Sequence, residues 1–360
     1  MKIQPEPAQA GLDPADPPLL MTDIRVSADF PKLLQRLRFS FAFSSYQTGQ
    51  LFLVGVQPDG AISVSQQNYF GAMGLSWSKG RLFLATQTQI WRLENLLLPG
   101  ELGDHKNDAV LVPRQGWTTG YLDTHEIAIG TDDHPIFVAT KFNCLGTIDE
   151  RLSFKLVWKP NFISDVVPED RCHINGLALD DGVPAYVTVT GKSDQHDGWR
   201  EHRVDQGLVI DCRTNHAVAI GLSMPHSPRL HDGKLWLLES GRGYLVQIDL
   251  ATGAKTDIAF CPGFARGLSF GDGYALVTIS KPRDAKFHGL PLDGELEKRK
   301  LPAMCGVLII DLESPRTIGW LALEGNIDEV FDVAALPNIQ CPVSLGLNTR
   351  EILINIRASH

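Results

Sequence analysis

The sequence predicts an all-β fold, a six-bladed β-propeller, and three observations carry this prediction. A short motif recurs six times along the 360 residues, and such long-period repetition is typical of repeat architectures. Each of the first five copies is followed by a second apolar run rich in β-branched and aromatic residues, as strands require. Helical periodicity is almost absent after Leu37. The six copies of the motif lie at residues 70–77, 124–129, 172–179, 225–230, 264–270 and 330–334.

The intervals between copies fit one blade per repeat. Between equivalent positions they run from 38 to 66 residues, and four strands of five or six residues plus turns need roughly 40–50 residues. The longest interval, the last, leaves room for an insertion, which we place at about residues 280–302 because that segment is rich in Lys, Arg, Pro and Gly.

The two ends of the chain are expected to meet in one blade. Residues 41–45 and 50–55 read as strands before the first full repeat, and the last repeat is followed by few strand candidates. We therefore expect N-terminal strands to complete the final blade and close the ring, which removes an open sheet edge. This predicts one propeller domain over residues 36–357, preceded by a flexible, proline-rich tail over residues 1–35.

Composition limits the partners of this chain. A net charge of −9 argues against nucleic acid and anionic membrane. No apolar run approaches the roughly 20 residues of a membrane span, and no signal peptide is visible. The six cysteines are scattered without a Cys-x-x-Cys pair, which favours reduced thiols and a cytoplasmic protein. The oligomeric state stays open.

Histidine stands at the same register in three consecutive repeats. These are His125, His173 and His226, whereas the other copies carry Gly, Phe or Val there, so the repeat itself does not demand histidine. Inner strands of a propeller line its central channel, so the three imidazoles are expected to converge at one mouth. Three histidines with open coordination positions are typical of a catalytic transition-metal site for Fe, Zn, Cu or Mn.

Strand alternation predicts which other side chains share this channel. Residues two apart face the same side, which adds Asn175, Arg266 and Asp332 to the lining, and Glu126 is a further candidate acid–base or orienting group. Arg229 is out of phase with His226 and is expected to point away from the channel.

Basic residues follow several of the second strands, although the chain is acidic. A ring of cations at one mouth would suit a small anionic or peptide-like substrate. The candidates are Lys141, Lys192, Arg242 and Lys281.

Residues 172–179, 225–238 and 264–270 together resemble an uncharacterised bacterial β-propeller family, known as a domain of unknown function. The resemblance covers roughly residues 35–355 and implies the fold. More distantly, residues 175–177 (Asn-Gly-Leu) are similar to an inner strand of gluconolactonase and regucalcin propellers, which implies a metal-ligand role for Asn175. The three histidines depart from that family's oxygen-rich site.

The favoured hypothesis is a metal-dependent enzyme. His125, His173 and His226 would hold a divalent metal, Glu126, Asp332 and Arg266 would assist catalysis, and the basic residues with Asn175 would position the substrate. Hydrolase, lyase and oxygenase are all open.

Two alternatives stand beside it. One is a non-catalytic propeller that binds a peptide, glycan or partner protein on the same face, using exposed aromatics such as Trp199. The other is an enzyme without metal in which the histidines act directly as general acid and base.

Overall fold

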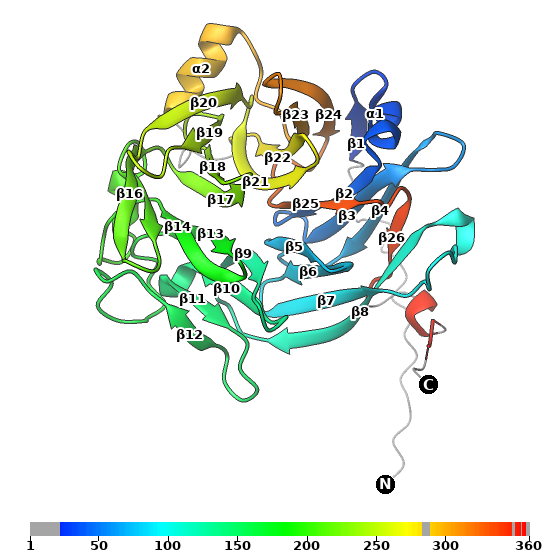
Figure 1. Ribbon diagram of the computed structural model, residues 1–360, viewed down its shortest axis with the longest axis horizontal. Helices are drawn as coiled ribbons and strands as arrows, with labels where there is room; N and C mark the ends of the chain where they lie inside the picture. Colours follow the sequence, from blue (N-terminus) through cyan, green and yellow to red (C-terminus); the bar gives the residue numbers. More distant parts are fainter. Residues whose placement is uncertain (1–21, 283–288, 348–349, 354, 358–360) are drawn as a thin grey trace, which may run out of the picture.

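Six sheets form a ring, one per predicted blade, and their strands pair antiparallel except for one parallel pair at the edge of one sheet (Figure 1). A computed structural model describes residues 22–282, 289–347, 350–353 and 355–357. The innermost strands contact one another around the ring, each next to the inner strand of the following sheet. The six-bladed β-propeller predicted from the repeats is therefore confirmed.

The inner strands are β5 (Leu75–Ser78), β9 (Thr124–Ile129), β13 (Ile174–Asp180), β17 (Pro225–His231), β21 (Phe264–Gly271) and β25 (Val333–Pro337). The strands outside them are β6 (Arg81–Ala85), β7 (Gln89–Asn95), β8 (Ala109–Thr118), β10 (Pro135–Ala139), β11 (Cys144–Thr147), β12 (Lys155–Trp158), β14 (Val183–Val189), β15 (Gly207–Asp211), β16 (His216–Leu222), β18 (Lys234–Glu239), β19 (Tyr244–Ile248), β20 (Lys255–Phe260), β22 (Tyr274–Ser280), β23 (Gly306–Asp311) and β24 (Arg316–Glu324). The remaining elements are β1 (Asp23–Val26), β2 (Phe39–Ser45), β3 (Gln50–Val56), β4 (Ile62–Asn68), β26 (Pro342–Ser344), α1 (Phe30–Leu37), α2 (Pro291–Arg299) and short 3-10 turns at Asp104–Lys106, Thr140–Phe142, Gly198–His202 and Arg350–Leu353.

The ring closes through the N-terminal strands, as predicted. The C-terminal inner strand β25 pairs antiparallel with β2, and β3 and β4 complete that sheet. Phe41 and Phe43 of β2 are fully buried and pack with Leu276 and Val307 of the preceding sheet. Closing one blade from both ends of the chain makes the ring depend on long-range pairing.

Part of the predicted flexible tail forms regular structure. Residues 1–21 lie outside the described part of the chain, but β1 adds a fifth strand beside β24 and α1 packs against β2, β3 and β24. Phe30, Leu33 and Leu34 form the buried stripe of α1, at the i, i+3 and i+4 spacing of an amphipathic helix. The flexible-tail prediction is thus wrong for residues 23–35.

The predicted insertion lies between β22 and β23 and contains α2. Residues 283–288 of this segment are outside the described part. Leu290 and Leu292 are buried against Trp199 and Phe264, so the insertion covers the edge of the channel mouth described below. Among the described residues, no helix has both the length and the apolar character needed to span a membrane.

Four inner strands are interrupted by a register shift within the channel. The pairing slips near the start of β9, β13, β17 and β21, and it slips a second time toward the end of β13. A β-bulge lets consecutive residues face the same side, because the extra residue breaks the alternation. Simple i, i+2 reasoning therefore fails in these strands.

Candidate functional site

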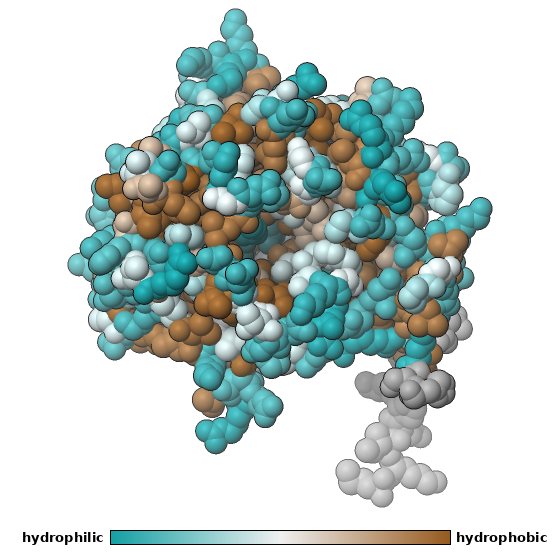
Figure 2. Space-filling view, in the orientation of Figure 1, coloured by the Kyte–Doolittle hydropathy of each residue, from teal (hydrophilic) through white to brown (hydrophobic). Residues whose placement is uncertain are grey.

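The three predicted histidines line one cavity of about 400 Å³ at one mouth of the channel. The space-filling view shows the molecule hollowed at the centre of the ring (Figure 2). His125 comes from β9, His226 from β17, and His173 directly precedes β13. The other lining residues are Tyr46, Met73, Tyr121, Asp123, Asp170, Trp199, Arg200, Met224, Phe264, Arg266, Glu329 and Phe331.

The imidazoles of His125 and His173 are direct neighbours. Their ring centroids are 5.0 Å apart in an edge-to-face arrangement. His226 lies edge-on to Phe264 at 5.7 Å, and its Nε2 is 3.5 Å from the Asn175 Nδ2. All three predicted histidines thus line one cavity, although a contact between two imidazoles is described only for His125 and His173.

Backbone carbonyls determine the tautomer of two of these histidines. His125 Nδ1 is 2.9 Å from the Asp123 carbonyl oxygen, and His226 Nδ1 is 2.9 Å from the Met224 carbonyl oxygen. A carbonyl only accepts hydrogen bonds, so the neutral rings carry their proton on Nδ1 and leave a lone pair on Nε2. Burial lowers the pKa of both rings, most strongly that of His226, where Arg266 adds repulsion. Both are therefore neutral at pH 7.

His173 is held by a carboxylate instead. Its Nδ1 lies 2.9 Å from the Asp170 Oδ2, which also accepts a hydrogen bond of 3.0 Å from the Trp199 indole. Burial opposes the ionised form, but the charge and hydrogen bond of His173 hold the pKa of Asp170 below its usual value. The Trp199 ring stacks on the imidazole at 4.2 Å. The orientation of the His173 ring is therefore set by Asp170 at its edge and by Trp199 against its face.

Left-handed backbone conformations set the direction of these side chains. The φ angles are 57° at Asp123, 49° at His173 and 45° at Met224. Such values are uncommon for residues other than glycine and are costly, so the surrounding structure must enforce them. Each occurs where the chain enters an inner strand from the mouth, and the Asp123 and Met224 carbonyls accept hydrogen bonds from His125 and His226.

The arrangement does not match a three-histidine metal site as it stands. Nδ1 anchoring is what metal-bound histidines require, because it directs Nε2 to the ion. Within the described residues, however, no three His, Cys, Asp or Glu side chains are grouped closely enough to hold a metal ion. The Asn175 amide also lies against the Nε2 of His226.

Arg266 lines the cavity between two aromatic rings. Its guanidinium is 5.2 Å from the Phe264 centroid and 5.1 Å from that of Phe331, and it pairs with Glu329 at 3.0 Å. Burial lowers the pKa of Arg266 to about 10, so it carries its charge at pH 7.

The predicted ring of cations is not part of this cavity. Arg242 is engaged by Glu239 and Asp257, and Lys281 pairs with Asp328 at 2.8 Å. The other two lie over aromatic rings, Lys141 over Tyr121 at 4.5 Å and Lys192 over Phe162 at 5.8 Å. None of the four lines the histidine cavity.

Two predicted acids lie deeper in the channel. Glu126 and Asp332 are 1% and 2% exposed and do not line the histidine cavity. Glu126 forms an ion pair with Arg229, while Asp332 accepts the Leu75 and Val333 N–H groups at 2.7 and 2.8 Å. The prediction that Arg229 points away from the channel is wrong, because the bulge in β17 turns it inward.

Asn175, predicted to contact the substrate, is instead buried and hydrogen-bonded within the protein. It is 2% exposed, its amide nitrogen reaches Thr190 at 3.3 Å, and its carbonyl accepts from Thr188 at 2.7 Å. Its described partners therefore take up both ends of the amide.

Sequence reasoning missed the acids around the histidines. Asp123 and Asp170 precede their histidines by two and three residues, a local signal that repeat alignment overlooked. Trp199 comes from a connection outside the repeats, so its arrival at the mouth depends on a loop path, whereas Phe331 lies within the sixth copy of the motif.

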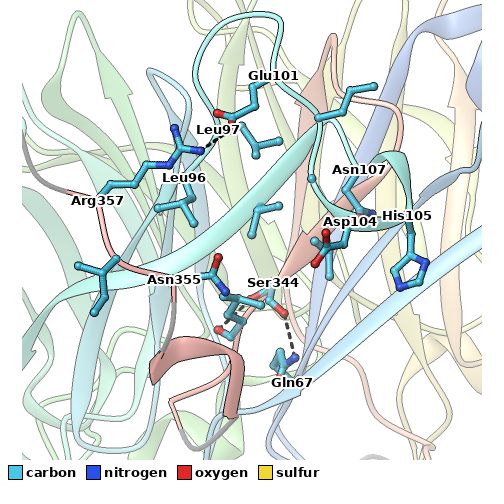
Figure 3. A pocket seen from close by; sticks show the side chains of 16 residues that line it. Gln67, Leu96, Leu97, Glu101, Asp104, His105, Asn107, Ser344, Asn355 and Arg357 are labelled. Carbon is cyan, nitrogen blue, oxygen red and sulfur yellow. Dashed lines mark hydrogen bonds and ion pairs between the residues drawn. The ribbon is translucent and has the colours of Figure 1, made fainter.

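A larger cavity, of about 730 Å³, lies away from the channel (Figure 3). It is bordered by β8, β26 and the C-terminal segment, where Gln67 donates to the Ser344 carbonyl at 2.8 Å and Arg357 pairs with Glu101. None of the three predicted histidines lines it, so the candidate active site is the smaller histidine cavity.

Comparison with known proteins identifies the family. The model of a domain of unknown function, DUF4915, matches residues 28–345. The chain belongs to the DUF4915 family. This confirms the resemblance to an uncharacterised propeller family, while the more distant one to gluconolactonase and regucalcin stays a prediction. A search of curated proteins finds no match.

Several solved structures are similar to this DUF4915 member over most of its length. A chain from a nidogen/laminin complex is similar at 9% identity and a TM-score of 0.51, covering 84% of this chain and 100% of that one. A Bacteroides caccae protein of unknown function has 10% identity, coverage of 83% and 99%, and a TM-score of 0.49. Virginiamycin B lyase from Staphylococcus aureus has 11% identity, coverage of 84% and 100%, and a TM-score of 0.40. At such identities a likeness concerns the fold alone.

Proposed function

We propose that the histidine mouth is the active site of an enzyme that moves a proton to or from a small polar substrate, with His173 as the general acid–base group. The observation that carries the proposal is the 2.9 Å contact between the His173 Nδ1 and the Asp170 carboxylate. A carboxylate on Nδ1 orients the ring and stabilises the imidazolium that forms when Nε2 takes a proton.

The charges of the lining favour a neutral or cationic substrate over the anionic one expected from sequence. Asp123, Asp170 and Glu329 supply three carboxylates, against the guanidinium of Arg266 and that of the exposed Arg200. Because Glu329 pairs with Arg266, the remaining acids dominate the cavity. Hydrolysis, elimination and isomerisation all use such a proton transfer, and the reaction class is left open.

A second candidate keeps the three histidines as ligands of a divalent Fe, Zn, Cu or Mn ion. The observation that favours it is the anchoring of Nδ1 in all three rings, which leaves Nε2 available as a donor. The rings would have to draw closer together than they are, since the present grouping does not suit an ion.

Exchange in D2O tests the acid–base proposal on many candidate substrates at once. Pools of small neutral and cationic polar metabolites are incubated with the protein, and proton NMR reports conversion or loss of C–H signals. We expect H173Q to slow the reaction by about 10²- to 10⁴-fold and D170N to slow it less. His134 and Asp132 form an exposed His–Asp pair at 3.3 Å, so H134Q is the matched control.

Three results would count against the proposal. Turnover that survives in H173Q would remove His173 from the chemistry. A ligand that binds unchanged in H173Q and is never converted would favour the non-catalytic binding propeller. A stoichiometric transition metal, lost in a folded H125A/H173A/H226A variant, would favour the metal candidate.

A further inference from the structure

The opposite end of the channel opens into a second cavity, of about 350 Å³, with a different character. Its walls come from the C-terminal parts of the inner strands, and most of the residues that line it are apolar by type, including Trp77, Leu179, Leu230 and Phe270, although polar atoms supply about half of the lining surface. Arg229 is the one charged side chain among the described residues that line it. Cavities lined mostly by apolar residues, with a few polar side chains that fix the ligand, are typical of small-molecule sites.

The Arg229 guanidinium is held from behind. Its Nη1 donates to the Pro228 carbonyl at 2.9 Å and lies 3.4 Å from the Leu177 carbonyl, and the ion pair with Glu126 uses the same nitrogen. The side chain nevertheless remains 22% exposed, whereas that of Glu126 is 2% exposed. A molecule entering this cavity therefore meets the cation but not its carboxylate partner.

The charges behind Arg229 leave room for another anion. Asp332 is held in its ionised form by two backbone N–H groups, although burial raises its pKa to about 6. Burial and the charge of Asp332 raise the pKa of Glu126 to about 8, against the opposing pull of Arg229. Burial thus works against a full negative charge on both acids that face the guanidinium from within the channel.

We propose that this second mouth binds a small molecule with an apolar body and a single carboxylate, which pairs with the Arg229 guanidinium while the body packs on Trp77, Leu230 and Phe270. A guanidinium suits this role because its planar fork can donate two hydrogen bonds to one carboxylate. The cavity is at the small end of ligand sites, so the ligand is a compact aromatic or branched aliphatic acid. The site is separate from the histidine mouth and does not depend on its proposed function.

Calorimetric titration with phenylacetate and 4-methylpentanoate tests this site, with phenylacetamide as the uncharged probe of the same shape. We expect the acids to bind at least tenfold more tightly than the amide at pH 7. Ser76 lines the cavity, and its side chain takes part in none of the hydrogen bonds described. The S76W variant should therefore fill the space and abolish binding of both kinds of probe.

Removing the cation tests the charge pairing itself. R229M alone would leave the buried carboxyl group of Glu126 without its partner, so the double variant R229M/E126Q is used. This variant should bind the acid and the amide probes equally weakly. Arg25 and Glu324 form an exposed ion pair at 3.0 Å, so R25M/E324Q is the matched control and should bind as wild type does. Circular dichroism confirms that each variant is folded.

Any of three results overturns the proposal. The first is equal binding of acid and amide to wild type. The second is a failure of both probes to bind at about 10 mM, which is weaker than any specific small-molecule site of this kind would be. The third is acid binding that persists in both folded S76W and folded R229M/E126Q.

Discussion

Replacing Glu126 by Gln should remove a loss of folding stability that the wild-type protein undergoes as pH rises. Glu126 is buried, accepts a 3.2 Å hydrogen bond from the Leu177 N–H, and faces Arg229 and Asp332. Burial raises its pKa from an ordinary 4.5 to about 8. The folded state therefore binds a proton that the unfolded chain releases between these values, and stability falls as pH rises through that window.

The size of the effect follows from the pKa difference. Each unit corresponds to about 1.4 kcal/mol, and because the titration of the folded state is only about half complete at pH 8, we expect a loss of roughly 2–4 kcal/mol between pH 5 and pH 8 from this group. The neutral amide of the glutamine side chain mimics the protonated carboxyl, so E126Q should match wild type at pH 5 and be the more stable protein at pH 8.

Urea unfolding at pH 5 to 8.5 measures this difference. Asp332, with a pKa raised to about 6, contributes its own fall in stability at the lower end, so the comparison above pH 6.5 isolates Glu126. E313Q, at an exposed turn position, is the control and should leave the pH profile unchanged. If E126Q is less stable than wild type at every pH, Glu126 is ionised and its pair with Arg229 outweighs burial.

Three further predictions concern the ring and the histidine mouth. F41A, in the closing strand β2, should lower the unfolding free energy by about 3–5 kcal/mol in urea, because a fully buried ring is lost; a loss below about 1 kcal/mol would mean that this blade does not limit stability. G267A should cost about 1–3 kcal/mol, since its Cβ would lie 2.6 Å from the Asp332 Cα, whereas G294A in α2 meets nothing within 4 Å and should be neutral or slightly stabilising; equal effects of the two would contradict this packing. Elemental analysis of tag-free protein should find well under one transition-metal ion per chain, and a stoichiometric ion that is absent from H226A would restore the metal hypothesis.

The fold was predictable because its signal is repeated. Six copies of one motif define the blades, and residues 41–55 were recognisable as the strands that complete the last blade, which β25 and β2 confirm. The N-terminal boundary was not, because α1 is only eight residues long and its stripe of three apolar side chains is easily read as part of a tail. Its order comes from packing against strands that are distant in sequence.

The candidate site was predictable in part. The shared register of His125, His173 and His226 correctly placed them in one cavity, since equivalent positions of successive blades meet at the same mouth. The position of Glu126 and Arg229 was not predictable from alternation, because bulges in β9 and β17 let adjacent residues face the channel.

By itself the sequence determined the number of blades, the closure of the ring and the gathering of three histidines. Each of these follows from a local strand pattern that recurs along the chain. Only the tertiary structure decided what those histidines touch. Asp170 reaches His173 through a left-handed turn, and Trp199 arrives from a loop between β14 and β15. The pairing of Arg229 with Glu126 joins two different blades across the channel. Such contacts depend on bulges and loop paths, which a strand's period of two does not encode.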